Sequence, residues 1–481
     1  MRFSTLALTI LIVTIHSIKA QDFAEIDSIA GKLVHTYGLK GIALIGVKDG
    51  KVIYSKGFGA ANETHKMEPS TPVYIASNTK SYIGLAMAQL IAQNKIGLQD
   101  PMTKYLTKSY FPEKLQLNSI TIRDVISHSH GLTNDPITFR TSSSGEYPEN
   151  LKELLQFTGY YGEGDTLVKK HRYSNFGYLL SGMIIEEVTG YHWKEYLKKF
   201  ILAPMRLNDT SPFMPSGPDA DKMALPYTFT QKAPLKQVKK SNTLHAAGGL
   251  FATPQDMGRW LGFHSMPEQL EKLFDLDMEH YFQPLTETED SLGPLKINGY
   301  GYGWYFGTVL DKPFNFHTGG FSGHASFMSY MPEEKLGFFA FTNESSSMFR
   351  SVLQLVLLYY NIMTEHSAKD EVNQMFTGMI KSIYEQKKDS PPSLGEPVDF
   401  DLPPGEYYSD MYGTLRITKH STGYELKLGN NLSSEAYKGE MENEVVAYFV
   451  PGSVERFYFE GSGTDMRIKF GEDFGYFYPK Q

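Results

Sequence analysis

The spacing of apolar side chains over the first hundred residues predicts a helix, a hairpin and a second helix. Residues 23–37 place apolar side chains three and four positions apart, which indicates one helical face. Residues 41–47 and 52–58 are predicted strands, and the Asp-Gly pair between them is a strong signal for a tight hairpin. Helical spacing returns over residues 77–97, where a glycine ends the run.

The later part of the chain predicts strands again. Residues 168–187 contain a second long helical run, residues 314–342 predict two strands joined near 332–335, and a helix is expected over 348–363. Strands therefore lie near both ends of this region, with a mainly helical middle. We expect an α/β sandwich in which N- and C-terminal segments form an antiparallel sheet flanked by helices, with a helical subdomain inserted between them.

The composition changes over residues 387–404 toward Pro, Ser, Gly and charged residues, which is typical of a linker. Beyond it, short alternating and aromatic segments separated by glycines predict a small antiparallel β-domain. These segments are residues 413–418, 424–428, 445–450, 456–459 and 466–470. The expected division is 1–20 signal peptide, 21–365 catalytic domain, 366–404 helix and linker, and 405–481 β-domain.

Charge and cysteine content narrow the functional classes. The net charge is -8 and no long basic run is present, which argues against a nucleic-acid partner and against docking on anionic membranes. Cysteine is absent, so the chain has no disulfide, no thiolate nucleophile and no thiolate metal site. No cofactor is expected.

The first twenty residues resemble a secretory signal peptide. Arg2 supplies the positive start, residues 6–15 are mostly apolar, and cleavage is expected after Ala20. The alternative is an uncleaved anchor, but the apolar run is short for a membrane span. We expect a secreted or periplasmic protein without a stable membrane anchor.

Candidate chemistry begins with Ser77 and Lys80. On a helix, residues three apart share a face, so the hydroxyl and the amine are expected to meet. A lysine whose pKa is lowered by burial or neighbouring charge can take the serine proton and make the hydroxyl nucleophilic. The start of a helix also stabilises developing negative charge.

Two further segments carry suitable groups. Tyr173 and Asn175 point to the same side if their segment is extended, so the phenol is a candidate base or proton relay and the amide a candidate substrate contact. The same Tyr-x-Asn pattern at Tyr359 and Asn361 lies in an apolar helical run and is interpreted as core.

A later glycine-containing segment follows a short β pattern. His317 and Thr318 are candidates to bind a substrate carboxylate or carbonyl. Gly319 and Gly320 allow close approach of a substrate backbone, and the Gly320 N–H is a candidate to form an oxyanion hole with the Ser77 N–H.

The order of these motifs resembles the penicillin-recognising serine hydrolases, in the branch of class C β-lactamases, D-Ala-D-Ala carboxypeptidases, D-amino-acid peptidases and related esterases. Residues 125–132 are similar to the "LLxHxSGL" segment of that family, and residues 247–257 to its "AGGLxSTxxDM" segment. The resemblance extends from about Ile26 to Met363. The C-terminal β-domain resembles the lipocalin-like domains appended to some members.

The resemblance implies that Ser77 is acylated, that Lys80 and Tyr173 share proton transfer, and that Asn175 contacts the substrate amide. β-Lactamases of this branch carry lysine where His317 stands, and a neutral histidine binds a carboxylate less strongly. We therefore expect a peptidase or carboxypeptidase for peptides that contain D-amino acids. A carboxylesterase or weak β-lactamase of the same fold is the alternative.

Two other classes remain open. His128 and His130 have the His-x-His spacing used in zinc sites, but the following Asp of such hydrolases is replaced by Leu132. A non-catalytic penicillin- or peptidoglycan-sensing protein would keep the same fold. The expected partner is a small peptide, ester or β-lactam substrate, and a homo-oligomer is left open.

Overall fold

The computed structural model describes most of the chain between residues 23 and 480. The described ranges are 23–161, 166–228, 233–235, 238–344, 349–365, 395–450, 453–462, 465–471 and 475–480, with isolated positions between 366 and 394. The expected signal peptide (1–20) and most of the segment expected to be helix and linker (366–404) lie outside them. Among the described residues, no helix has the length and apolar character needed to cross a membrane.

An eight-stranded antiparallel sheet forms the centre of the larger unit. Its strands are β1 (Gly41–Lys48), β2 (Lys51–Gly59), β7 (Thr286–Leu292), β8 (Leu295–Gly301), β9 (Trp304–Val309), β10 (Lys312–Phe321), β11 (His324–Met331) and β12 (Leu336–Thr342). Their order is β2-β1-β12-β11-β10-β9-β8-β7. The pairing of Leu44 with Ala340 joins β1 to β12 and so brings the early and late segments into one sheet, as the sequence predicts.

Eleven α-helices are described in this unit. They are α1 (Ala24–His35), α2 (Thr79–Ala92), α3 (Ile122–Ile126), α4 (Asp135–Phe139), α5 (Asn175–Thr189), α6 (Trp193–Leu197), α7 (Pro218–Lys222), α8 (Pro254–His264), α9 (Pro267–Phe274), α10 (Met278–Tyr281) and α11 (Phe349–Met363). Two short ladders pair β3 (Val73–Tyr74) with β6 (Phe251–Ala252) and β4 (Leu132–Thr133) with β5 (Gly159–Tyr160).

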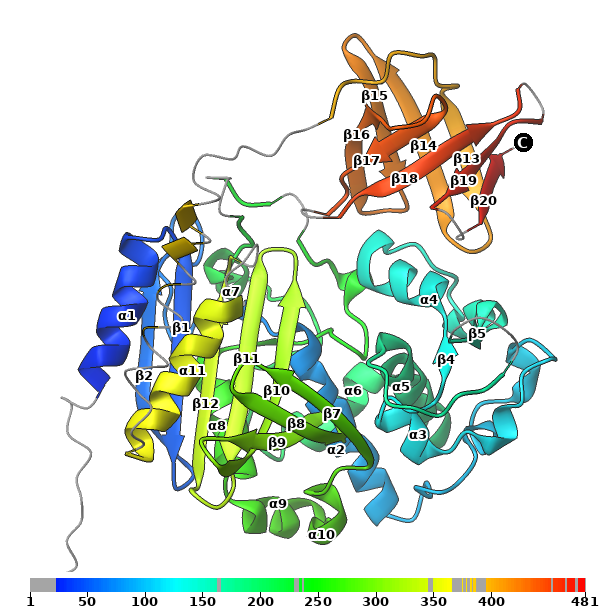
Figure 1. Ribbon diagram of the computed structural model, residues 1–481. Coiled ribbons are helices and arrows are strands. Elements are labelled where there is room, and N and C mark those ends of the chain that lie inside the picture. Colours follow the sequence, from blue (N-terminus) through cyan, green and yellow to red (C-terminus); the bar gives the residue numbers. More distant parts are fainter. Residues whose placement is uncertain are drawn as a thin grey trace, which may run out of the picture.

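The helices bury both faces of the sheet. α1 and α11 lie side by side across one face, and α2 and α8 cover the other (Figure 1). Alternation along β1 explains this arrangement, because Leu44 packs with the first pair of helices and Ile45 with the second. Because both faces are covered, β1 is buried along nearly its whole length.

The sequence prediction missed part of the sheet. Two strands were expected over residues 314–342, whereas the structure has three, because a short turn at Ser322 and Gly323 divides the first apolar stretch into β10 and β11. Strands β7, β8 and β9 were not predicted either. They extend the sheet by pairing in sequence with one another and with β10.

The C-terminal unit is a closed barrel in which each strand pairs with the next. Its strands are β13 (Gly405–Ser409), β14 (Gly413–His420), β15 (Gly423–Leu428), β16 (Leu432–Lys438), β17 (Glu444–Ala447), β18 (Glu455–Glu460), β19 (Arg467–Phe470) and β20 (Tyr476–Pro479). The small all-β domain is therefore confirmed. The sequence prediction missed β13, β16 and β20, and pairing of β13 with β20 closes the barrel and removes its free edges.

The barrel contacts the helical region through residues 140–146. The buried Arg140 donates from Nη1 to the carbonyl oxygen of Asp410 at 3.0 Å. The Glu146 carboxylate accepts hydrogen bonds from the backbone N–H and the hydroxyl of Thr414, at 3.0 and 2.9 Å. These polar contacts hold one rim of the barrel against the larger unit.

Candidate active site

Ser77 lies in a tight turn immediately before α2, a helix that is buried along most of its length. Residues Ala76–Asn78 form a single 3-10 turn, and α2 follows directly. Ala76 has φ 47°, a left-handed conformation that is uncommon for a residue other than glycine. Strain of this kind persists where the surroundings enforce it, often at functional sites. The turn leaves Ser77 partly exposed while its neighbours on both sides are buried.

Lys80 is fully buried one turn after Ser77. Its Nζ lies 3.1 Å from Ser77 Oγ, 2.8 Å from Asn175 Oδ1 and 2.7 Å from the carbonyl oxygen of Ala247. Burial lowers the pKa of the Lys80 ammonium well below its ordinary value of 10.5. A neutral amine suits these three partners, because two N–H groups donate to the two carbonyl-type oxygens and the lone pair accepts the Ser77 hydroxyl proton.

Tyr173 lies on the other side of this pair. The centre of its ring is 4.8 Å from Lys80 Nζ, and its hydroxyl is hydrogen-bonded to Ser77. Burial of the phenol raises its pKa above the ordinary value of 10.0, and the hydrogen bond with Ser77 offsets only part of that rise. The phenol therefore keeps its proton at neutral pH. Of the two roles considered for Tyr173, the geometry favours the proton relay over the base.

Asn175 is the first residue of α5, where the extended segment that carries Tyr173 turns into a helix. Because Asn175 Oδ1 accepts a hydrogen bond from Lys80, the orientation of the amide is set. Its Nδ2 is then the group left to donate to another acceptor.

His317 is buried in β10 and faces the same group of aromatic rings. Its ring centre lies 6.1 Å from that of Tyr173 and 5.5 Å from that of Tyr305. Nδ1 lies 2.7 Å from the carbonyl oxygen of Thr318, so Nδ1 carries the proton and Nε2 presents a lone pair. Burial lowers the pKa of His317 to about 3, and repulsion from Lys80 in its protonated form acts in the same direction. A neutral acceptor of this kind is a poor receptor for a carboxylate, contrary to one role considered for it.

The two glycines of β10 differ in their surroundings. A Cβ atom on Gly319 would lie 2.2 Å from the carbonyl oxygen of Ile75, whereas one on Gly320 would meet no atom within 4 Å. The close approach at Gly319 presses β10 onto the segment that leads into Ser77. Thr318 is partly exposed and Gly320 is exposed. Both residues are therefore accessible to a ligand next to the turn that carries Ser77.

This difference makes a matched pair of variants. Gly319→Ala should lower the free energy of unfolding by about 1–3 kcal/mol, because the added methyl group forces β10 away from Ile75. Gly320→Ala, in open space on the same strand, should leave the melting temperature nearly unchanged. Thermal denaturation of both variants checks this, and equal melting temperatures would contradict the close packing at Gly319.

His128 has a positioning role that the sequence did not indicate. Its Nδ1 accepts the backbone N–H of Ser174 at 3.2 Å, and its carbonyl oxygen accepts that of Arg172 at 2.8 Å. These bonds flank Tyr173 on both sides and fix its segment. His130 is also engaged, since its Nδ1 accepts the N–H of Leu132. In the described part of the chain, no group of three His, Cys, Asp or Glu residues is arranged to hold a metal ion.

Ala247 is a second contributor that sequence reasoning passed over. In the sequence, residues 247–257 stand out only as a family-like motif, yet the carbonyl oxygen of Ala247 accepts a hydrogen bond from Lys80. Every residue has a backbone carbonyl group, so residue type does not indicate which one binds Lys80. Only the fold identifies this partner.

The Ser-x-x-Lys turn, the Tyr-x-Asn segment and the glycine-containing strand thus meet at one place. The beta-lactamase family model matches residues 26–359, which include all of these segments. The chain belongs to the beta-lactamase family. Strand order, helices and the site described above are therefore those of a family member that carries an additional C-terminal barrel.

Among related sequences, Protein flp of Staphylococcus aureus (strain COL) is 25% identical over 371 residues, which cover 76% of this chain and 70% of that protein. The teichoic acid D-alanine hydrolase of Staphylococcus aureus (strain NCTC 8325 / PS 47) is 29% identical over 289 residues, 59% of this chain and 66% of that protein.

Solved structures show the same fold. The octameric penicillin-binding protein homologue from Pyrococcus abyssi has a TM-score of 0.60 at 19% identity and covers 95% of this chain and 99% of its own. The D-amino acid amidase from Ochrobactrum anthropi SV3 in complex with D-phenylalanine has a TM-score of 0.59 at 20% identity, covering 72% and 99%. The match to 95% of this beta-lactamase-family chain extends into the region of the barrel.

Proposed function

We propose that this family member is a serine hydrolase that forms an acyl-enzyme on Ser77 and acts on the carbonyl group of a D-amino acid in a peptide, amide or ester. The observation that carries the proposal is the fully buried Lys80 amine, 3.1 Å from Ser77 Oγ and held by two acceptor oxygens. This arrangement is suited to removing a proton from a hydroxyl, and no acidic residue is required for it.

The reaction begins when the Lys80 amine takes the Ser77 proton and Oγ bonds to the substrate carbonyl carbon. The carbonyl oxygen becomes an oxyanion, which the N–H groups of Ser77 and Gly320 stabilise in this proposal. As the bond to the leaving group breaks, that group takes a proton that passes from Lys80 through Tyr173. Water then attacks the ester on Ser77 by the same route, giving the free acid and regenerating the hydroxyl.

The preference for a D-amino acid is supported by the relative named as a teichoic acid D-alanine hydrolase. The family fold also accommodates a D-amino acid amidase. The neutral His317 supplies no cation for a terminal carboxylate. We therefore favour a D-aminoacyl substrate, whose own carbonyl group is attacked, over the substrate of a carboxypeptidase. A carboxypeptidase must recognise a free carboxylate beside the scissile bond.

Purified protein can be tested on a panel of chromogenic D-alanyl and L-alanyl esters and anilides, a D-Ala-D-Ala peptide, p-nitrophenyl butyrate and nitrocefin. We expect the highest kcat/KM for D-alanyl derivatives over their L-alanyl counterparts. Turnover of only p-nitrophenyl butyrate would indicate a simple esterase. Covalent labelling by a fluorescent penicillin without any turnover would indicate the sensor class.

The role of His317 gives a separate prediction. His317→Lys should raise the rate on nitrocefin, which carries a carboxylate, relative to that on a D-alanyl ester by about tenfold, because an ammonium binds the carboxylate with a charge-assisted hydrogen bond. His317→Gln, which stays neutral, is the matched control. An equal rise in both variants, measured as the ratio of the two kcat/KM values, would contradict this account of His317.

We also propose export through the segment at 1–20, for which the support is its sequence pattern alone. The N-terminal sequence of protein recovered from culture medium or periplasm tests this, with cleavage after Ala20 as the expected result.

A further inference from the structure

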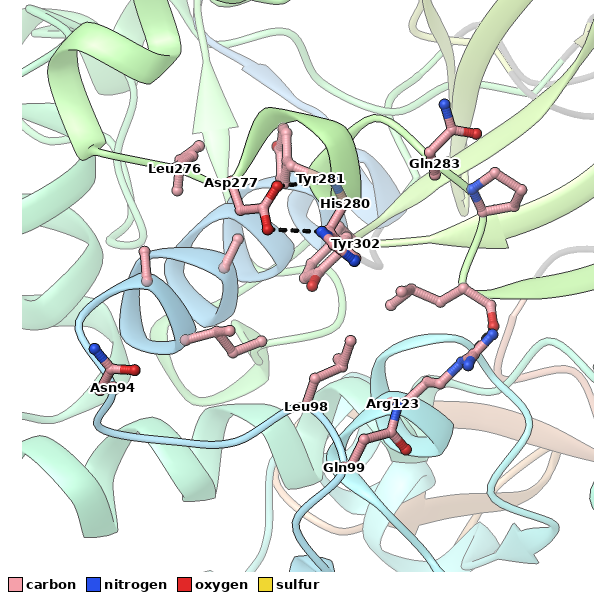
Figure 2. A pocket seen from close by; sticks show the side chains of 15 residues that line it. Asn94, Leu98, Gln99, Arg123, Leu276, Asp277, His280, Tyr281, Gln283 and Tyr302 are labelled. Atoms are coloured by element: carbon pink, nitrogen blue, oxygen red, sulfur yellow. Dashed lines mark hydrogen bonds and ion pairs between the residues drawn. The ribbon is translucent and has the colours of Figure 1, made fainter.

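A cavity of about 680 Å³ opens at the end of α2 opposite to Ser77. It is enclosed by the C-terminal half of α2, the start of α3, α10 and the turn between β8 and β9, and none of the proposed catalytic residues lines it. Its walls are largely apolar, and Ala88, Ile91 and Leu285 are among the residues that line it. Leu98 and Leu276 line it as well (Figure 2). Small-molecule sites in proteins are commonly cavities of about 300–1,000 Å³ with mostly apolar walls and few polar groups.

Arg123 supplies a cation at the edge of this apolar surface. Arg123 is exposed, and its Nε donates to the carbonyl oxygen of Leu285 at 2.7 Å. In the described part of the chain, no ion pair joins Arg123 to a carboxylate. The nearby Asp277 is paired instead with His280 at 2.6 Å, away from Arg123 (Figure 2). The Nε bond orients the guanidinium, and its remaining N–H groups match a carboxylate or phosphate.

The cavity is connected to Lys80 by close backbone packing. Tyr302 lines the cavity and has φ 50°, a strained conformation for an aromatic residue. A Cβ atom on Gly84 of α2 would lie 1.9 Å from the Tyr302 carbonyl oxygen, and one on Gly303 would lie 2.4 Å from the Lys80 carbonyl oxygen. A shift of Tyr302 would therefore displace the first turns of α2, because atoms packed this tightly leave no space for Tyr302 to move alone.

We propose that this cavity is a binding site for an anionic single-chain amphiphile, with the apolar chain between α2 and Leu276 and the anionic group on Arg123. The anion is a carboxylate, as in a fatty acid, or a phosphate, as in an alkyl phosphate. The apolar walls provide the affinity for the chain, and the unpaired guanidinium selects the sign of the headgroup.

Isothermal titration calorimetry tests this with decanoate, decyl phosphate and decyltrimethylammonium, each below its micelle concentration. The Ser77→Ala protein is the host, so that binding is measured independently of any hydrolysis. We expect saturable binding of one or both anions and at least tenfold weaker binding of the cation. The ratio of the two anions distinguishes a fatty carboxylate from a phosphate headgroup. Equal affinity for the anions and the cation would overturn the proposal.

Two variants separate the charge from the cavity. Arg123→Gln should weaken decanoate binding about tenfold, and Arg123→Lys should restore part of it. Ile91→Trp should weaken binding with the charge intact, because the indole fills the apolar space. Circular dichroism verifies that each variant is folded. Unchanged affinity in both Arg123→Gln and Ile91→Trp would place the ligand elsewhere and overturn the site.

The connection to Lys80 has its own test, which rests on the proposed hydrolase activity. Saturating decanoate should change kcat on a D-alanyl ester in the wild type but not in Arg123→Gln. Unchanged kcat with intact binding would overturn the coupling and leave the binding site standing. Absence of turnover in every protein would instead overturn the proposed function.

Discussion

Replacement of Ser77 with alanine is expected to abolish covalent labelling by a fluorophosphonate and to lower kcat by roughly a thousandfold or more, because the atom that forms the acyl bond is removed. Lys80, Tyr173 and the strand at Gly320 would remain in place. Ser77 is partly exposed, and its side chain is hydrogen-bonded to Lys80 and Tyr173. Loss of these two bonds should leave the fold intact.

Ser70→Ala is the matched control, since Ser70 is an exposed serine outside the site. It should keep both labelling and turnover. Mass spectrometry of the labelled wild type should place the adduct on the peptide that contains Ser77. Labelling of the Ser77→Ala protein at the wild-type rate would show that another residue is the nucleophile and would refute the proposed mechanism.

Replacement of Lys80 with methionine should lower kcat by about a thousandfold while leaving Ser77 in place, because general-base catalysis typically contributes factors of this order. Methionine preserves the length and bulk of the side chain at this fully buried position. Lys95→Met, at an exposed lysine beyond the end of the same helix, is the matched control and should retain activity. Wild-type turnover in Lys80→Met would exclude Lys80 as the base.

The lowered pKa of Lys80 gives this prediction a pH dependence. The Lys80 amine is the active base when it is neutral. We therefore expect kcat/KM to be highest above the pKa of Lys80 in the folded protein and to fall as the pH drops through that pKa. The unfolded chain binds the Lys80 proton up to about pH 10.4, whereas the folded protein releases it earlier, so folding stability should rise with pH in this window. Burial also lowers the pKa of Lys194 to about 8 and that of Lys239 to about 7, so these lysines contribute to the same rise. The free energy of unfolding of Lys80→Met should therefore rise less steeply with pH than that of the wild type, as urea titrations between about pH 7 and pH 10 would show.

His317 should not contribute to these pH profiles above about pH 5, because its pKa is lowered to about 3. The acidic limb of a kcat/KM profile therefore reports on Lys80. Subtraction of the His317→Gln profile from that of the wild type separates the two groups. A limb that moves in His317→Gln would contradict the neutral state of the histidine.

Local pattern was sufficient for much of the fold. The hairpin of β1 and β2, the helix after Ser77 and the antiparallel domain at the C-terminus follow from apolar period and turn residues, which act over a few positions. Strands β7, β8, β9, β13, β16 and β20 were missed. Their conformation is imposed by hydrogen bonding to neighbouring strands, which a local pattern does not contain.

The sequence by itself determined the family-like order of motifs, the Ser77 and Lys80 pair on one helical turn, and the absence of thiol chemistry. The tertiary structure decided the states of the groups. It buries Lys80 against Asn175 and Ala247, keeps the proton on Tyr173 and leaves His317 neutral. These properties depend on desolvation and on partners far away along the chain. Residue type and spacing specify which groups are present, and only packing specifies their charge.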